Sequence, residues 1–208
     1  MAMADASPWL LVGLGNPGRE YAHNRHNVGF MVVERWVDDH LPAGVGASWR
    51  EKFHARTVTV AFRGERVVVL EPQTFMNRSG KSVVAATQFF RVPPAQIVVV
   101  HDELDFETGR VAVKQGGGHG GHNGLRDIIA QSGNSDFVRI RVGIGRPLRG
   151  GNVSQWVLSD FDGHDAAILP DVVDRAQQAI SAVISDGVRA AMNTFNQSSP
   201  PSGPAAIP

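Results

Sequence analysis

The stretch Trp-Leu-Leu-Val-Gly-Leu-Gly-Asn-Pro-Gly at residues 9–18 decides the fold of this chain. Its first six residues form a short apolar run, which predicts a buried strand. The glycines and the proline that follow predict a turn. Apolar residues then recur at helical spacing between 28 and 41, so a strand, a polar loop and a helix follow one another. This order is typical of α/β domains.

The remaining sequence continues the alternation of strands and helices. Further strands are predicted at 97–100, 110–114 and 137–144, a hairpin at 53–62 and 66–70 around Arg-Gly-Glu, and helices at 82–90, 124–131, 172–184 and on to about 195. These patterns predict a single α/β domain over residues 1–197, with a twisted mixed, mostly parallel β-sheet flanked by α-helices. Residues 198–208 are rich in Pro, Ser and Ala without periodicity, so we expect a disordered tail there.

The composition excludes several classes of protein. The 208 residues include no cysteine, so the chain has neither a disulfide framework nor a thiol nucleophile. The N-terminus lacks the basic and apolar regions of an export signal, and no run approaches the roughly 20 apolar residues that cross a bilayer. We therefore expect a soluble cytoplasmic protein.

The charge of the chain is balanced overall but uneven along its length. The formal net charge is zero, yet residues 110–151 contain seven basic side chains against two acids. A local positive patch on a neutral protein is suited to contact with a few phosphates at one place, and not to coating a nucleic acid. By itself, the pattern more often reflects an ordinary solvated surface.

Polar side chains gather in the glycine-punctuated loops that follow the apolar runs. Asn16 and His26 follow the first run, Asn77 follows the hairpin, Asp102 ends the run at 97–100, and Asn123 lies in Gly-Gly-His-Gly-Gly-His-Asn-Gly at 117–124. Ligand sites of such sheets form at the carboxyl ends of the strands, and we expect all these loops to lie there. Neutral amides beside a His/Asp pair favour a site that binds a peptide-like group and activates water.

Each of these residues also has a simpler interpretation. A lone loop histidine is usually a surface residue, and Asp102 could cap a helix or a turn. Asparagine is common in turns because it tolerates the left-handed conformation, and Asn123 could be the N-cap of the helix that begins at Gly124. Three such turns at one edge of a sheet make the simpler interpretation less satisfactory.

Three other motifs are weaker, and a fourth is absent. Gly13-x-Gly15-x-x-Gly18 matches the dinucleotide fingerprint, but Pro17 interrupts it and no helix begins within the glycines. Gly80-Lys81-Ser82 resembles the end of a P-loop but lacks the required first glycine. His119 and His122 could chelate a metal, although no third ligand accompanies them. No Gly-x-Ser-x-Gly elbow is present, which disfavours an ordinary serine esterase. We therefore predict no metal and no cofactor.

The motifs taken together closely resemble the bacterial-type peptidyl-tRNA hydrolase family. The resemblance covers roughly residues 9–195. It is carried by Gly-Leu-Gly-Asn-Pro-Gly-x-x-Tyr at 13–21, Arg-His-Asn-Val-Gly at 25–29, Pro-x-Thr-Phe-Met-Asn-x-Ser-Gly at 72–80, His-Asp-Glu-Leu-Asp at 101–105, Lys-x-Gly-Gly-Gly-His-Gly-Gly-His-Asn-Gly-Leu at 114–125 and Arg-Ile-Arg-Val-Gly-Ile-Gly at 139–145.

The resemblance implies a reaction and a set of roles. The reaction would be hydrolysis of the ester that joins a peptide, or an N-blocked aminoacyl group, to the tRNA 3′ ribose, by a monomer without cofactor. By position, His26 would activate the attacking water, Asp102 would orient and polarise it, and Asn16 would help to hold the ester. The implied binding residues are Asn77 and Asn123 for the peptide backbone, Tyr21, Phe75 and Met76 around the reacting end, His122 near the substrate, and Lys114 and Arg141 for a tRNA phosphate.

Two alternatives belong to other functional classes. A non-catalytic RNA-binding relative would be expected to have replaced His26 or Asp102, and both are present. An esterase for another N-acyl ester would not need Lys114 and Arg141, so charge reversal there distinguishes it from a tRNA-directed enzyme.

Overall fold

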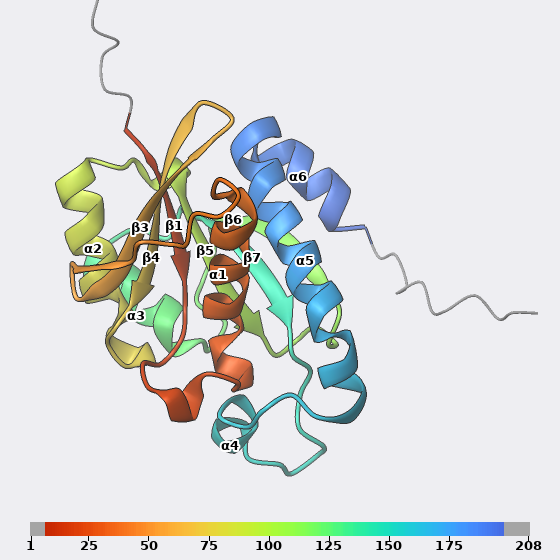
Figure 1. Cartoon of the computed structure of the whole chain (residues 1–208). Helices are drawn as coiled ribbons and strands as arrows, with labels where there is room; N and C mark the ends of the chain where they lie inside the picture. The colour runs from red at the N-terminus through yellow and green to blue at the C-terminus, as the bar shows by residue number, and fades with distance from the viewer. Residues whose placement is uncertain (1–6, 198–208) are drawn as a thin grey trace, which may run out of the picture.

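A seven-stranded mixed β-sheet with helices on both faces forms the body of the molecule (Figure 1). The computed structural model describes residues 7–197, so the tail predicted at 198–208 lies outside the described residues. The strands are β1 (Trp9–Gly13), β2 (Arg50–Lys52), β3 (Ala55–Phe62), β4 (Glu65–Pro72), β5 (Ile97–Glu103), β6 (Val111–Gln115) and β7 (Val138–Gly143). The α-helices are α1 (Val28–His40), α2 (Ser79–Phe90), α3 (Asn123–Ser132), α4 (Val153–Val157), α5 (Gly163–Asp186) and α6 (Val188–Phe195).

The sheet is parallel in its centre and antiparallel at its edges. The strand order is β2-β3-β4-β1-β5-β7-β6. The four central strands β4, β1, β5 and β7 pair in parallel, while β2 with β3, β3 with β4, and β6 with β7 pair antiparallel. The predicted mixed α/β sheet is confirmed. The expectation that it is mostly parallel is wrong, because three of the six strand pairings are antiparallel. Only the central strands pair in parallel, and they read as continuous apolar runs because they are buried on both faces.

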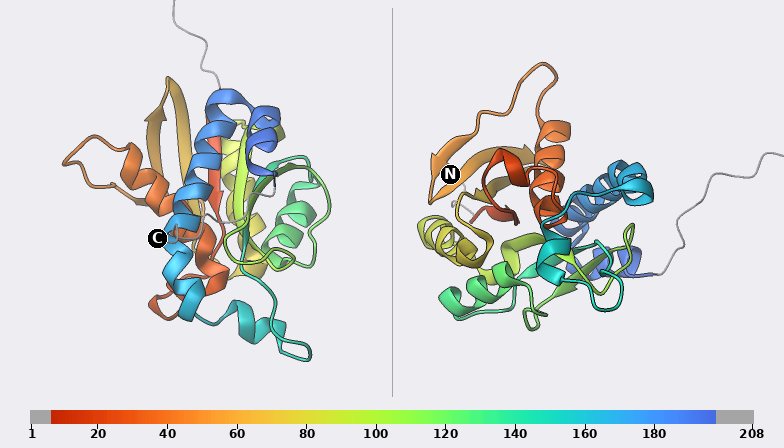
Figure 2. Two further views of the ribbon diagram at one scale, coloured as in Figure 1. Left: turned by 90° about the vertical axis from the view of Figure 1, so that its right-hand side faces the viewer. Right: turned by 90° about the horizontal axis from the view of Figure 1, so that it is seen from below.

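Two apolar layers cover the faces of the sheet. One layer lies between the sheet and the helices α1, α5 and α6 and includes Trp36, Val100 and Ile180. The other lies under α2 and α3 and includes Leu70 and Ile128. Figure 2 shows these helices on opposite sides of the sheet. None of the helices within residues 7–197 combines the length and hydrophobicity needed to cross a membrane.

Glycine contacts bring the start of α1 close to the central strands. A Cβ placed on Gly13 would lie 2.5 Å from the Gly29 carbonyl oxygen, and one placed on Gly29 would lie 2.5 Å from backbone atoms of Leu14 and Val100. Only glycine permits such a backbone approach. The glycines of the first motif therefore serve helix–strand packing, and they place the residues just before α1 at the carboxyl end of β5.

Two predicted boundaries are wrong and one short helix was missed, each for a local reason. The hairpin strand expected to begin at 53 begins at Ala55, because Phe53 and His54 form a turn with φ of 59° and 56° that leads back to the unpredicted β2. Such a turn normally contains Asn or Gly, so the sequence carried no signal for it. The helix expected from 172 begins at Gly163 and runs through Pro170. The five-residue α4 was not predicted, because it is too short to show a period.

Candidate functional site

Two histidines share one carboxylate oxygen at the carboxyl edge of the central strands. His26 Nδ1 lies 2.8 Å from Asp102 Oδ1, and His122 Nε2 lies 2.9 Å from the same oxygen. His26 belongs to a 3₁₀ turn, η2 (Arg25–Asn27), that follows β1, and Asp102 is the penultimate residue of β5. All three side chains are largely buried. The structure thus brings together three predicted residues that are 76 and 20 positions apart in the chain.

The electrostatics of this group favour an ionised aspartate and a basic His26. Burial alone would raise the pKa of Asp102, but the charges of His26 and His122 and their hydrogen bonds hold it well below its usual range. Burial alone would lower the pKa of His26, yet the charge of Asp102 and its hydrogen bond outweigh burial and raise the pKa above 6.5. Because Nδ1 of His26 contacts the carboxylate, the neutral tautomer leaves Nε2 as the basic nitrogen.

The third member, His122, is the N-cap of α3. Its Nδ1 accepts hydrogen bonds from the backbone N–H groups of Gly124 at 3.1 Å and Leu125 at 3.4 Å. That nitrogen is therefore unprotonated, and Nε2–H donates to Asp102. The simpler interpretation of Asn123 as the N-cap of this helix is wrong: Asn123 is the first helical residue, is exposed, and accepts a hydrogen bond from Arg126 at 2.8 Å.

The glycine-rich loop that carries His122 reaches the site by an unexpected route. We predicted that all the polar loops follow carboxyl strand ends, but β6 runs antiparallel to β7, so its end at Gln115 pairs with the start of β7 at Val138. The glycine-rich loop therefore begins at the edge of the sheet opposite the site and runs back to the carboxyl edge, where His122 contacts Asp102. Arg139, which is buried, donates to the carbonyls of Gly117 and Gly118 and holds this path.

Asn16 is held by backbone and side-chain contacts on both sides. Its Oδ1 accepts from the Met76 N–H at 2.8 Å. Its own N–H donates to Asn27 Oδ1 at 3.0 Å, and its carbonyl accepts from Asn27 Nδ2 at 2.9 Å. Because Oδ1 is occupied, the Asn16 amide presents Nδ2 as its remaining donor. The hydrogen bonds that Asn16 makes with the described residues involve its backbone and Oδ1, and none of them uses this Nδ2.

The other predicted binding residues surround this centre less tightly. Met76 is buried against Gly124, whereas Phe75 is 58% exposed and meets Tyr21 edge-on with ring centroids 6.5 Å apart. Asn77 lies in the next 3₁₀ turn, η3 (Met76–Arg78), with its side chain exposed. Aromatic and amide groups thus border the site on the side of β4.

The two predicted phosphate ligands lie on the opposite side, on β6 and β7. Lys114 is exposed on the edge strand, and the register pairs it with Arg139 and pairs Ala112 with Arg141, so that Lys114 and Arg141 share a face. Arg141 is half-buried, donates to Glu103 Oε2 at 2.9 Å and lies 4.2 Å above the Phe106 ring. Glu103 therefore already neutralises part of its charge.

Sequence reasoning missed three buried polar residues next to the centre. Arg25 and Asn27 flank His26, and His101 precedes Asp102. The His101 ring meets the His122 ring at 5.1 Å, and its Nδ1 donates to the Asp102 carbonyl at 2.7 Å. Burial, together with the nearby His122, lowers the pKa of His101 to about 3. The only sequence signal for these three residues was their position, because each of them adjoins His26 or Asp102.

The same three ligand atoms could in principle hold a metal ion. The donor atoms of His26, Asp102 and His122 lie within 4.8 Å of one another, and two imidazoles with a carboxylate form a ligand set that zinc uses. In this arrangement, however, both imidazoles contact one oxygen at hydrogen-bond distance. His119, the other candidate ligand, instead accepts a hydrogen bond from Gly121 N–H at 3.0 Å.

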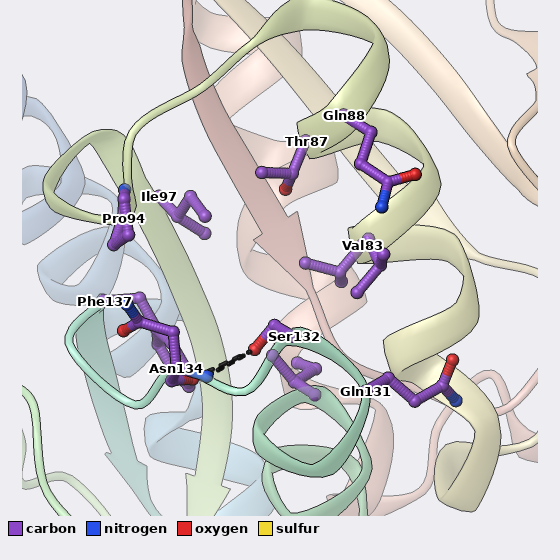
Figure 3. Close-up of a pocket in the computed structure, with 11 residues that line it drawn as sticks. Val83, Thr87, Gln88, Pro94, Ile97, Gln131, Ser132, Asn134 and Phe137 are labelled. Carbon is purple, nitrogen blue, oxygen red and sulfur yellow. Dashed lines mark hydrogen bonds between the residues drawn. The ribbon is translucent and has the colours of Figure 1, made fainter.

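A separate cavity of about 230 Å³ opens between α2 and α3 (Figure 3). It is lined by Val83 and Thr87 of α2, by Ile97 at the start of β5 and by Ile128 of α3, among others. Because Ile97 begins the strand that Asp102 nearly ends, the cavity lies at the opposite edge of the sheet from the candidate site.

The fold and the site define an α/β protein with a histidine–carboxylate pair at the carboxyl edge of its sheet, an arrangement suited to hydrolysis. A family model described as peptidyl-tRNA hydrolase matches residues 10–202. A peptidyl-tRNA hydrolase of Sorangium cellulosum is 47% identical over 190 residues, covering 90% of this chain and 83% of that protein. One of Mycolicibacterium smegmatis is 43% identical over 193 residues, covering 92% and 98%. The chain belongs to the peptidyl-tRNA hydrolase family.

Solved structures agree with this assignment. The crystal structure of peptidyl-tRNA hydrolase from Acinetobacter baumannii has a TM-score of 0.83 at 38% identity and covers 94% of this chain and 97% of that one. A complex of a peptidyl-tRNA hydrolase with N-propanol has a TM-score of 0.85 at 39% identity, covering 93% and 97%. The resemblance found in the sequence motifs is thereby confirmed, and the protein is a hydrolase by family.

Proposed function

We propose that this protein hydrolyses the ester between a peptide, or an N-blocked aminoacyl group, and the 3′ ribose of tRNA, and so recycles tRNA from peptidyl-tRNA released by stalled ribosomes. The observation that carries the proposal is the buried His26–Asp102 pair next to the Asn16 amide. Family membership supports the substrate. We further propose that the protein acts in the cytoplasm as a monomer, without a metal.

The first step is general-base attack of water on the ester. His26 Nε2 takes a proton from water while the water oxygen bonds to the ester carbonyl carbon, and the carbonyl electrons move onto oxygen. Through its contact with Nδ1, Asp102 orients the His26 imidazole and with it the attacking water. Asp102 also stabilises the imidazolium that forms. The Nδ2 group of Asn16 is suited to donate to the developing oxyanion.

The second step expels the ribose. The oxyanion re-forms the carbonyl, the bond to the 3′ oxygen breaks, and the imidazolium returns its proton to that oxygen. The products are a free peptide carboxyl group and a tRNA hydroxyl group. Since an alkoxide leaves an ester more readily than an amine leaves an amide, a base and amide donors suffice in this scheme without a covalent nucleophile.

Substrate selection would use the groups on either side of the centre. Asn77 and Asn123 would hydrogen-bond the peptide backbone, with Tyr21, Phe75, Met76 and His122 around the reacting end, and Lys114 and Arg141 would contact a tRNA phosphate. Neutral amides offer no partner for the charge of a free α-ammonium group. We therefore expect ordinary aminoacyl-tRNA to be cleaved far more slowly than its N-acetylated form, and equal rates would contradict this part of the proposal.

The test is release of N-acetyl-aminoacyl groups from tRNA by wild type, His26→Ala and Asp102→Asn, with EDTA throughout. We expect rapid wild-type turnover in EDTA, a loss of about 10²–10⁴-fold in His26→Ala and an impaired Asp102→Asn. Binding of tRNA without cleavage by wild type would replace the proposal with a binding function. Full activity of His26→Ala would refute the mechanism.

A further inference from the structure

The buried arginine beside the catalytic histidine has no part in the chemistry proposed above. The Arg25 side chain is only 1% exposed, although it carries a charge. A buried charge is costly unless it is paired and hydrogen-bonded. The position of this charge, in the same single turn of 3₁₀ helix as His26, makes its partners important for the geometry of the site.

The partners of Arg25 all come from one distant segment, residues 156–165. The guanidinium donates to Ser159 Oγ at 2.8 Å and to the Asp160 carbonyl. It pairs with Asp162 at 2.9 Å and with Asp165 at 3.4 Å. Its Cζ atom lies 3.9 Å from the ring centroid of Trp156. Arginine suits this arrangement because a planar guanidinium can stack and donate in several directions at once.

The backbone reinforces the same attachment. Arg25 N–H donates to the Ser159 carbonyl at 2.9 Å, and Asn24 forms an isolated antiparallel bridge with Asp160. The Asn24 side chain also donates to Asp160 Oδ1 at 2.7 Å. Figure 1 shows α4 at the carboxyl end of the sheet, beside the loop that precedes α1. The turn that carries His26 is therefore joined to the α4–α5 connection by both side chain and backbone.

The opposite side of the same turn is held by Asn27. Its side-chain amide bonds both the N–H and the carbonyl of Asn16. Three consecutive residues thus make different contacts. Arg25 attaches the turn to residues 156–165, Asn27 attaches it to Asn16, and His26 between them contacts Asp102. Trp156, which stacks on Arg25, also donates to the Gly145 carbonyl at 3.0 Å, so the attachment extends to the beginning of the β7–α4 loop.

We propose that Arg25 is a positioning residue for His26, and that residues 156–165 are part of the scaffold of the active site although they contact none of the reacting groups. The proposal rests on the proposed function for its kinetic consequences, but not for its structural ones. Displacement of a catalytic group by about 1 Å can reduce a rate about 10²-fold. We therefore expect loss of this attachment to lower kcat and to leave KM nearly unchanged.

The test compares Arg25→Met and Arg25→Lys with the control Arg35→Gln. Arg35 also pairs with two aspartates, Asp39 and Asp174, but is 52% exposed and lies on the far part of α1. We expect Arg25→Met to lose about 10–100-fold in kcat, with KM within about threefold of wild type. Arg25→Lys should recover part of this loss, because lysine keeps the positive charge but lacks the planar guanidinium group. The control Arg35→Gln should match wild type.

A second readout needs no substrate. NMR titration of His26 should show its pKa moving down toward 6.5 in Arg25→Met, because a loosened turn loses the contact with Asp102 that raises this pKa. If wild type proves inactive on every tRNA ester while this shift occurs, the proposed function fails and the positioning role stands. If kcat and the His26 pKa stay at wild-type values while only Tm falls, Arg25 is merely structural and the proposal is overturned.

If Arg25→Met does not fold, two variants that keep the arginine take its place. Trp156→Leu and Asp162→Asn each remove one partner, and Asp162 is 85% exposed. Both are expected to reduce kcat by about three- to tenfold, since several contacts remain. Wild-type kcat and an unshifted His26 pKa in both variants would overturn the proposal.

Discussion

At the scale of single residues, the proposed chemistry depends on which atoms of His26, Asp102 and His122 face one another. Both imidazoles contact Asp102 Oδ1, so the aspartate accepts two hydrogen bonds and remains ionised. The contact consumes Nδ1 of His26 and Nε2 of His122. Of the two histidines that contact Asp102, only His26 therefore keeps a nitrogen that is free to act as a base, because Nδ1 of His122 accepts hydrogen bonds from the start of α3.

The pH dependence of the rate should report the His26–Asp102 pair. Only neutral His26 can accept a proton, so activity should fall as pH drops below its raised pKa. In Asp102→Asn the charge that raises this pKa is gone while burial still lowers it. We expect the acid limb of kcat/KM to move to lower pH and the plateau to fall by about tenfold or more. An acid limb that stays in place would show that another group sets it.

A second buried carboxyl group controls stability and not chemistry. Glu71 is fully buried on β4, where burial and the nearby Glu34 raise its pKa to about 8 although Arg56 lies 3.2 Å away. Its proton is retained in the folded state and lost in the unfolded state between pH 4.5 and 8, so folding stability falls as pH rises through this window.

Glu71→Gln removes that titration and keeps the shape of the side chain. We expect the decrease in Tm between pH 5 and pH 8 to be smaller in the variant than in wild type. Thermal unfolding at a series of pH values measures the difference, and Glu65→Gln, at an exposed position on the same strand, is the control. Parallel curves for Glu71→Gln and wild type would contradict the prediction.

At the scale of secondary-structure elements, the approach of α1 to β1 and β5 decides whether His26 reaches Asp102. Gly29 sits at the second position of α1 against the Leu14 and Val100 backbones. Gly29→Ala would require these backbones to separate. We expect a loss of several kcal/mol of stability and a large loss of kcat. Gly46→Ala is the matched control, since a Cβ there meets nothing within 4 Å.

The N-cap of α3 links helix formation to the site. His122→Ala removes both the cap and the contact with Asp102, whereas His122→Asn retains a good capping residue. We expect His122→Ala to lose about 1 kcal/mol of stability and His122→Asn to lose little. Both should show the same altered kinetics, because neither donates to Asp102 as the imidazole does. Chemical denaturation and hydrolysis assays on the two variants separate the effects.

At the scale of the whole molecule, the groups proposed to bind tRNA lie on the β6–β7 side of the site and those proposed to bind peptide lie toward β4. Exposed Lys114 is free to meet a phosphate, while Arg141 is already paired with Glu103. Lys114→Ala should therefore weaken tRNA binding and reduce the slope of log Kd against log salt by about one unit. A small N-acyl ester should be cleaved at the wild-type rate, and an unchanged salt slope would remove Lys114 from the interface.

The sequence by itself determined the fold class, the main helices and strands, and the group of residues at the site. Central strands are buried on both faces and read as apolar runs, and glycine and asparagine mark the loops between them. The family motifs then identified His26, Asp102 and the surrounding amides. These signals are local, because each depends on residues within a few positions of one another.

Only the tertiary structure decided the partners across the sheet. The reversal of β6, the return of the glycine-rich loop to Asp102, and the attachment of Arg25 to residues 156–165 all join segments with no sequence pattern in common. The turn at Phe53–His54 and the cap at His122 likewise run against residue preference. In each case contacts from distant segments outweigh the weak local preference of the chain, which is why the sequence alone could not reveal them.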